Sequence, residues 1–236
     1  MTADKISYVF PPAPTPSVAV TDASEMFPVR RIFCVGRNYA DHAREMGSDP
    51  DREPPFFFTK PADAVVADGS EIPYPPETRN YHYEVELVVA IGRDGFRVAP
   101  EQALEMVYGY AVGLDMTRRD LQNRAKETGR PWDWGKAFDQ SAPCGAIQTV
   151  SRAGHPTTGA ITLLVNGVLR QSGDIGDLIW SVADVISIIS QSMALKPGDL
   201  IYTGTPAGVG PVAAGDRLVG AIAGVGSLSV SIGRPR

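Results

Sequence analysis

Two glutamates interrupt an otherwise apolar segment of the chain. Glu84 and Glu86 lie in YEVELVVA, residues 83–90, whose other residues are typical of a buried β-strand. Alternate residues of a strand share one face and lie about 6.6 Å apart, so both carboxylates would point the same way. Neighbouring carboxylates in apolar surroundings repel each other and resist desolvation, and a bound cation relieves both costs. The pair therefore predicts a metal site, and with it a metal-dependent enzyme.

Asp115 adds a third carboxylate to this set. It follows the apolar residues 108–114, which also form a predicted strand. Three carboxylates could supply three oxygens and leave positions open for a chelating substrate. Oxygen-only ligands favour a hard divalent ion, Mg²⁺ or Mn²⁺ with Ca²⁺ also compatible, over zinc. The alternative is that Glu86 or Asp115 faces solvent, or that Asp115 caps a helix expected over residues 117–128.

The composition is that of a globular, strand-rich chain. Of 236 residues, 43% are hydrophobic and 21% charged, and the 24 glycines and 20 prolines favour many turns. We expect an extended, proline-rich arm over residues 1–28 and one mixed catalytic domain over residues 29–236. Strands are expected at 31–36, 107–114 and 200–203, with small-residue strands over 217–233 and a hairpin over 162–171 about Asn166-Gly167. Helices are expected at 39–46 (capped by Asn38 and stopped by Gly47), 100–106, 117–128 and 179–193, and loops at 130–139 and 204–210.

Charge and hydropathy narrow the classes of partner. A net charge of −5 without a basic run argues against nucleic-acid binding. No run of about 18 apolar residues occurs, so we expect no membrane span. Cys34 and Cys144 are too few for a disulfide framework, and the N-terminal residues lack the order of a signal peptide. These features predict a reduced, cytoplasmic protein.

His42 and Glu45 lie three residues apart on the first expected helix and would share a face. A carboxylate beside an imidazole raises its basicity, as a general base for water requires. A solvated surface helix is the commoner origin of such spacing, so spacing alone does not establish the pair.

Lys136 stands in an irregular, aromatic segment. If buried, it would direct a positive charge at an anionic substrate; if exposed, it is a solvated lysine. The loop at 204–210 lacks the ending of a phosphate-binding loop. Its backbone N–H groups and the Thr205 hydroxyl could instead bind a carboxylate.

Five segments in order resemble the fumarylacetoacetate hydrolase family, over about Ile32 to Gly233. They are VGRNYADH (35–42), FTKP (58–61), YEVEL (83–87), GLDMT (113–117) and KPGDLIYTGTP (196–206). The segment RPWDWGK (130–136) and the proline-rich arm are most similar to the bacterial fumarylpyruvate hydrolase branch.

The resemblance implies an α+β, β-rich fold, a mixed β-roll with short peripheral helices and a lid helix. It implies a metal held by Glu84, Glu86 and Asp115, and a lid that carries His42 and Glu45. Lys136 matches the active-site lysine of the family. Substrate-binding positions match Arg119, Gln122, Thr205 and Lys60. A homodimer is implied as well.

The implied activity is hydrolysis of a C–C bond in a 2,4-dioxo acid, first of all 3-fumarylpyruvate, giving fumarate and pyruvate. Acetylpyruvate hydrolysis and oxaloacetate decarboxylation in the same family are alternatives. A metal- or carboxylate-binding protein on the same scaffold is the non-enzymatic alternative. Arg37, Arg118 and Arg124 are candidates for the distal carboxylate, and the sequence does not choose between them.

Overall fold

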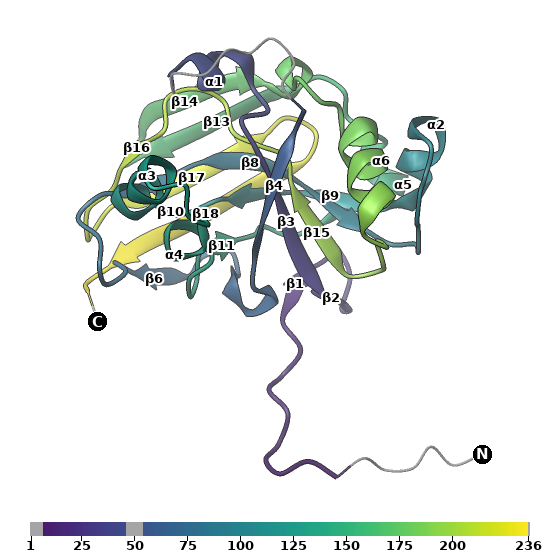
Figure 1. Ribbon diagram of the computed structural model, residues 1–236, viewed down its shortest axis with the longest axis horizontal. Helices are drawn as coiled ribbons and strands as arrows, with labels where there is room; N and C mark the ends of the chain where they lie inside the picture. The colour runs from purple at the N-terminus through teal and green to yellow at the C-terminus, as the bar shows by residue number, and fades with distance from the viewer. Residues whose placement is uncertain (1–6, 46–53, 236) are drawn as a thin grey trace.

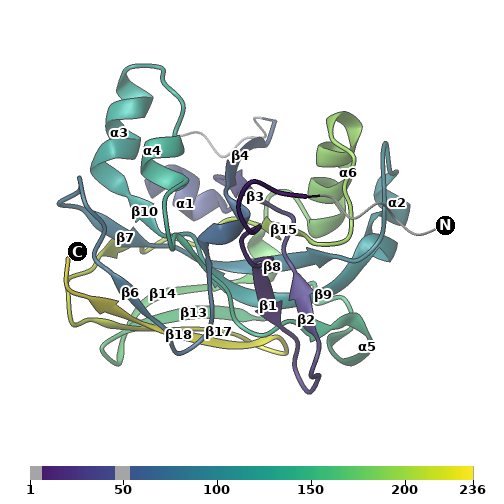
Figure 2. The same ribbon diagram turned by 90° about the horizontal axis from the view of Figure 1, so that it is seen from below.

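The computed structural model describes residues 7–45 and 54–235, apart from the side chains of residues 43–45. Two β-sheets dominate this part of the chain (Figures 1 and 2), so the predicted β-rich α+β class is confirmed. None of its helices is long and apolar enough to cross a membrane.

The larger sheet has six strands in the order β12-β9-β8-β15-β3-β4. β15 lies antiparallel to β8 and parallel to β3, so the sheet is mixed. The strands are β3 (Arg31–Gly36), β4 (Phe56–Lys60), β8 (Val85–Ile91), β9 (Val107–Leu114), β12 (Gln148–Thr149) and β15 (Asp199–Tyr202).

The second sheet has five strands in the order β14-β13-β17-β18-β6 and lies below the first in Figure 2. Its strands β13 and β17 alternate buried and less buried residues, as expected for a sheet with one face on the core. The strands are β6 (Glu71–Pro73), β13 (Ala160–Val165), β14 (Val168–Asp174), β17 (Arg217–Ile222) and β18 (Gly226–Gly233).

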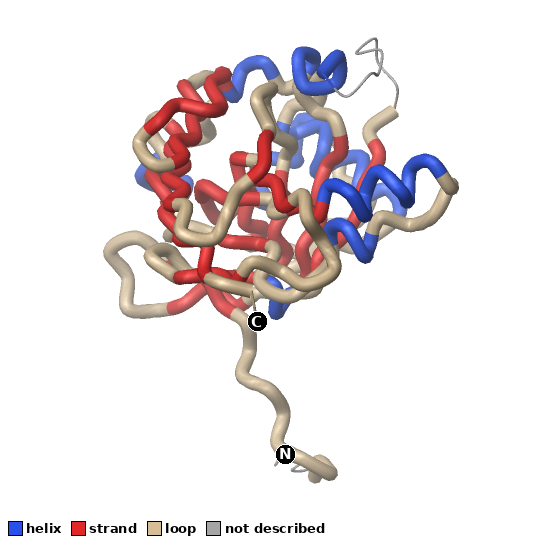
Figure 3. Tube along the Cα trace, turned by 90° about the vertical axis from the view of Figure 1, so that its left-hand side faces the viewer, coloured by secondary structure: helices blue, strands red, loops and turns tan. Residues whose placement is uncertain are grey.

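β8 is buried on both faces. Val85, Leu87 and Val89 pack into the core between the two sheets. Val88 and Ala90 pack into a second cluster, which the hairpin of β1 (Ser17–Ala19) and β2 (Met26–Pro28) covers. Such double burial explains the continuous apolar sequence that surrounds Glu86. Residues 7–16 run away from the body of the protein (Figures 1 and 3), and the boundary at residue 28 stays a prediction.

The remaining elements are short and lie at the edges of the sheets. α6 packs against α2, on the side of the molecule opposite α3 and α4 (Figure 1). The helices are α1 (Ala40–Glu45), α2 (Pro100–Ala103), α3 (Arg119–Glu127), α4 (Asp133–Lys136), α5 (Val150–Ala153) and α6 (Val182–Ser192), with 3₁₀ turns η1 (Ala62–Ala64), η2 (Leu104–Met106) and η3 (Ile175–Asp177). The short strands are β5 (Val65–Val66), β7 (Tyr81–Tyr83), β10 (Thr117–Arg118), β11 (Ala142–Pro143) and β16 (Gly210–Pro211).

Several predicted elements have the observed bounds or nearly so. Strands 31–36 and 107–114 match β3 and β9, and helix 100–106 matches α2 with η2. The predicted hairpin turn is confirmed, because Asn166 and Gly167 both have positive φ, 52° and 79°.

Several local expectations were wrong. β7 ends at Tyr83 and β8 begins at Val85, so Glu84 lies between two strands rather than within one. The segment expected to be a loop at 130–139 contains α4, and the helix expected from residue 117 begins at Arg119 after β10. The helix expected from residue 179 begins at Val182, because Ser181 and Asp184 form a capping box there.

Asn38 was expected to cap a helix and instead joins two loops. Its amide donates to the carbonyls of Trp180 (2.9 Å) and Thr203 (2.8 Å), and its oxygen accepts from Trp180 N (2.7 Å). The predicted helix stop, Gly47, lies outside the described residues.

Gly109 lies where β12 crosses close to β9. A Cβ atom there would collide with the backbone carbonyl oxygen of Gln148, which cannot move as a flexible side chain can. We expect Gly109→Ala to lower the free energy of unfolding by about 1–3 kcal/mol, measured by thermal or urea denaturation. Gly233→Ala is the matched control, because the nearest atoms there belong to the exposed side chain of Glu71. Equal losses of stability in the two variants would contradict this account.

Candidate active site

The structure brings the three predicted carboxylates together. One oxygen from each of Glu84, Glu86 and Asp115 lies within 4.8 Å of the others. All three are buried, with exposed fractions of 5%, 2% and 1%. Such a cluster can hold a divalent metal ion through oxygen ligands.

The break between β7 and β8 creates this cluster. β7 belongs to a separate three-stranded sheet, in which it pairs with β10 and β16, whereas β8 pairs with β9 from Val85↔Leu114 onward. Glu84 and Asp115 therefore occupy the positions just beyond that ladder, where Asp115 N donates to Glu84 O (2.9 Å). Glu86, two residues into β8, completes the group.

Lys136 is the principal cation of the cluster. Its Nζ lies 2.8 Å from Glu84 Oε2 and donates to Asp115 Oδ2 and Thr117 Oγ1, both at 2.6 Å. The side chain is 2% exposed, which excludes the solvated alternative. Its neighbour Trp134 is largely exposed. The short helix α4 thus turns Lys136 inward.

Lys60 supports the same group from the end of β4. Its Nζ lies 2.8 Å from Asp115 Oδ1 and donates to Met116 O at 3.1 Å and to the carbonyl of Lys136. Lys60 therefore joins the acidic cluster to the turn that carries Lys136.

Arg119 and Gln122 lie one turn apart on α3 and are both buried. Arg119 donates to Glu84 Oε1 and, at 2.6 Å, to Gln122 Oε1. His82 accepts from Arg119 Nε at 3.4 Å, and burial together with the Arg119 charge lowers the pKa of His82 to about 4. A neutral His82 therefore lies behind Arg119.

Thr205 reaches the site from the loop after β15. Its hydroxyl donates to Val85 O (2.8 Å) and accepts from Gln171 Nε2 (2.8 Å). Gln171, which the sequence analysis missed, also accepts from Val85 N and is 1% exposed. The register of the predicted hairpin could have indicated its burial, because Gln171 lies opposite the core residue Leu163 and so faces the same side of the sheet.

His42 is buried, so the solvated-helix alternative does not hold for this residue. It is 6% exposed and lines the same cavity as the carboxylates. The side chain of Glu45, its proposed partner, lies outside the described residues. The pairing of the two stays a prediction.

Electrostatics divide the carboxylates into two kinds. Burial raises the pKa of Glu84, but the charges of Lys136 and Arg119 outweigh it and hold the pKa well below its usual range. For Glu86, burial and then the negative charges of Asp115 and Glu84 raise the pKa well above its usual range, against one hydrogen bond from Gly204 N (2.9 Å). Glu86 thus resists ionisation unless further positive charge is supplied.

A divalent cation fits this donor set. Asp115 Oδ1 is buried and accepts no hydrogen bond within the described part of the chain, its contact with Lys60 being an ion pair without hydrogen-bond geometry. The cluster therefore offers a metal ion one carboxylate oxygen that accepts no hydrogen bond, Asp115 Oδ1. It also offers the Glu86 carboxyl, whose negative charge nearby cations do not balance.

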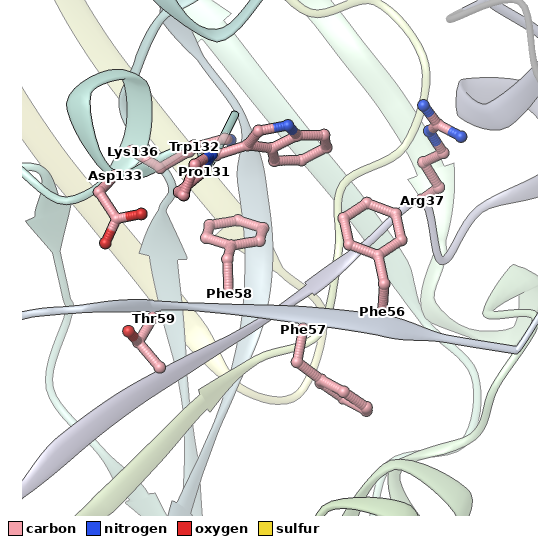
Figure 4. A pocket seen from close by; sticks show the side chains of 9 residues that line it. All are labelled: Arg37, Phe56, Phe57, Phe58, Thr59, Pro131, Trp132, Asp133 and Lys136. Atoms are coloured by element: carbon pink, nitrogen blue, oxygen red, sulfur yellow. The ribbon is translucent and has the colours of Figure 1, made fainter. Parts of the chain in front are cut away.

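Two cavities share part of their walls beside the cluster. The carboxylates and His42 line a cavity of about 20 Å³, enough for one water-sized species. A cavity of about 580 Å³ adjoins it, with Arg37, Phe58, Trp132 and Lys136 in the walls of both. Figure 4 shows Phe56 and Phe58 on one side of β4, near Trp132, with Phe57 on the other.

Comparison with known proteins identifies the family of the chain. Residues 31–232 match the family described as "Fumarylacetoacetate (FAA) hydrolase C-terminal". The chain belongs to the fumarylacetoacetate hydrolase family. The predicted resemblance is confirmed.

Individual relatives cover most of the chain. A fumarylpyruvate hydrolase of Ralstonia sp is 49% identical over 190 residues, which are 80% of this chain and 98% of the relative. The mitochondrial oxaloacetate tautomerase FAHD1 of Bos taurus is 43% identical over 206 residues, 87% of this chain and 93% of the relative. The crystal structure of fumarylpyruvate hydrolase from Pseudomonas aeruginosa, in complex with Mn²⁺ and pyruvate, is 57% identical with a TM-score of 0.95, covering 97% of this chain and 100% of that chain.

The raised pKa of Glu86 has a consequence for stability. The folded state binds the proton of the Glu86 carboxyl more tightly than the unfolded state does. The protonated group therefore adds to the free energy of unfolding at pH values below the ordinary carboxyl pKa. This contribution to stability is lost as the pH rises through the raised pKa of Glu86 in the folded state. In metal-depleted protein at pH 7, Glu86→Gln should therefore raise Tm, by roughly 2–4 °C for each kcal/mol of repulsion removed.

Differential scanning calorimetry with and without EDTA measures this effect. Glu71→Gln, at an exposed carboxylate, is the control. A lower Tm for Glu86→Gln in metal-free buffer would contradict the electrostatic account.

Proposed function

We propose that this protein is a metal-dependent hydrolase that cleaves a C–C bond of an acylpyruvate, with 3-fumarylpyruvate as its substrate and fumarate and pyruvate as products. The observation that carries the proposal is the buried carboxylate cluster, short of positive charge and set beside Lys136 and His42 in one cavity. The identities to the two fumarylpyruvate hydrolases support the choice of substrate.

In this proposal Glu84, Glu86 and Asp115 hold Mg²⁺ or Mn²⁺, with Ca²⁺ also compatible. When bound, the ion supplies positive charge that polarises the substrate oxygens and stabilises negative charge as it develops. The relative from Pseudomonas aeruginosa is in complex with Mn²⁺ and pyruvate, which supports both the ion and the three-carbon fragment.

The donors around the cluster bind the pyruvate end of the substrate. Arg119, Gln122 and Thr205 present guanidinium, amide and hydroxyl groups near the carboxylates, and Lys136 adds an ammonium. We assign Lys60 a positioning role, because its Nζ contacts Asp115 and two backbone carbonyls.

His42 acts as the general base. It takes a proton from a water molecule, whose oxygen attacks the carbonyl carbon of the fumaryl group. The C–C bond on its pyruvate side breaks, and the electron pair moves to the pyruvate fragment as an enolate. Lys136 stabilises that charge, and a proton returned to carbon gives pyruvate. Glu45 would orient His42 within the lid helix α1.

The oxaloacetate tautomerase relative favours a second candidate activity. The same cluster would bind oxaloacetate or acetylpyruvate through identical carboxylate and oxo groups, so acetylpyruvate hydrolysis or oxaloacetate chemistry is the alternative. A non-catalytic metal- or carboxylate-binding role is the remaining one. We further propose a cytoplasmic homodimer that acts in gentisate-type aromatic catabolism.

The first assay follows the absorbance of enzymatically generated fumarylpyruvate with Mn²⁺ or Mg²⁺ and then with EDTA. We expect metal-dependent loss with one pyruvate and one fumarate formed per substrate. Asp115→Ala should abolish both turnover and the Tm increase that Mn²⁺ causes, because it removes a ligand. Glu101→Ala, exposed on α2, is the control. Retained metal-dependent turnover in Asp115→Ala would refute the ligand assignment.

His42→Ala should slow turnover by roughly 10²–10⁴-fold, the usual contribution of a general base. The Mn²⁺-induced Tm increase should persist, because the three carboxylates are intact. His155→Ala is the matched control, since His155 is exposed and bonds Tyr110 instead (2.7 Å). A near-normal rate in His42→Ala would assign the base elsewhere.

A further inference from the structure

Two cations near the cluster have no part in the chemistry above. Arg37 and Lys126 line the same small cavity as the three carboxylates. Arg37 also lines the adjoining cavity of about 580 Å³. They come from the turn after β3 and from the last turn of α3, so the fold brings together two distant parts of the chain.

Neither Arg37 nor Lys126 forms an ion pair with a carboxylate among the side chains of residues 7–42 and 54–235. Arg37 Nε is buried without a hydrogen bond to that part of the chain. Lys126 is half-buried, and burial and then the charges of Arg119 and Arg37 lower its pKa to about 8. Two cations that are desolvated together repel each other, and an anion placed between them removes that cost.

Aromatic rings hold both cations in place. Arg37 Cζ lies 5.6 Å from the ring centre of Phe56, and Lys126 Nζ lies 5.0 Å from that of Trp132. Phe56 and Trp132 themselves meet edge to face at 5.0 Å. The four side chains thus form a continuous series, three of which Figure 4 shows around the larger cavity.

The backbone at Arg37 is built for this packing. A Cβ atom on Gly36 would overlap the ring of Phe56, so glycine is required for the ring to lie there. Arg37 itself has a φ of 56°, in the left-handed region that few non-glycine residues adopt. The backbone conformation at Arg37 and the ring of Phe56 together fix the direction in which the arginine side chain leaves the chain.

We propose that Arg37 and Lys126 bind the distal carboxylate of the substrate, at the end of the fumaryl group. This inference rests on the proposed function, which requires a substrate with a carboxylate at each end. The cluster binds the pyruvate end, and the small cavity is too narrow for the remainder. The acyl group extends past Phe58 and Trp132, along the wall that the two cavities share, toward Arg37.

The structure also disfavours the other two arginines considered from the sequence. Arg118 stacks on Phe138, with Cζ 4.3 Å from the ring centre, and is not among the residues lining either cavity. Arg124 is exposed on α3. Lys126 follows two residues after Arg124 on that helix, and the sequence analysis did not name it.

The test compares kcat/KM for fumarylpyruvate with that for acetylpyruvate, which lacks the distal carboxylate, in the Mn²⁺-loaded enzyme. Arg37→Gln and Lys126→Gln should each lower the fumarylpyruvate-to-acetylpyruvate ratio roughly ten- to a hundredfold, the range for losing one charged hydrogen bond. Lys126→Arg should restore most of the ratio, and Arg124→Gln, the matched charge-removing control, should leave it at the wild-type value.

A ratio that stays within about twofold of wild type in both Gln variants would overturn the proposal, even if both rates fall. If the wild type cleaves neither compound, the proposed function fails, and calorimetric binding of fumarate and crotonate tests the cation pair by itself. The proposal then requires the wild type to bind the dicarboxylate more tightly and both Gln variants to lose this preference. Equal affinities in the wild type would overturn it.

Discussion

The buried contact between carboxylates and lysines is the interaction on which the rest of the site depends. Glu84 and Asp115 are both buried against Lys136, and Asp115 is also buried against Lys60. Ions taken out of water are costly unless closely paired, so the position of each group is fixed by the others. In the part of the chain that the structure describes, Glu86 forms no ion pair with a lysine or arginine, and this imbalance makes the cluster suited to a metal ion.

The acidic cluster was predictable from sequence because carboxylates are rare among apolar residues. The sequence alone left open that Glu86 or Asp115 faces solvent, and the structure excludes this because both are buried. The strand break at Glu84 was not predictable, since its cause is the pairing of β7 with β10 and β16, which are distant in sequence. The prediction reached the correct residues through a strand geometry that Glu84 does not have.

Residues defined by tertiary packing escaped sequence analysis. Gln171 is a lone buried amide among exposed neighbours, and only its pairing with Leu163 turns it inward. Asn38 resembles a helix cap locally, but Trp180 and Thr203 compete successfully for its amide. Lys126 resembles a solvated lysine of a polar helix until Trp132 packs beside it. In each case the deciding partner lies elsewhere in the chain.

The hydrogen bonds of α4 give Trp132 a place in the site beyond its contact with Lys126. The carbonyl of Trp132 accepts from the backbone N–H of Lys136 (2.9 Å), and the carbonyl of Lys136 accepts from Lys60. An indole is thereby tied by main-chain bonds to the lysine that contacts the acidic cluster. Trp132 is consequently an intrinsic optical reporter, since its emission depends on the charge and packing around it. Binding of a metal ion at the three carboxylates could be followed through tryptophan fluorescence without any added label.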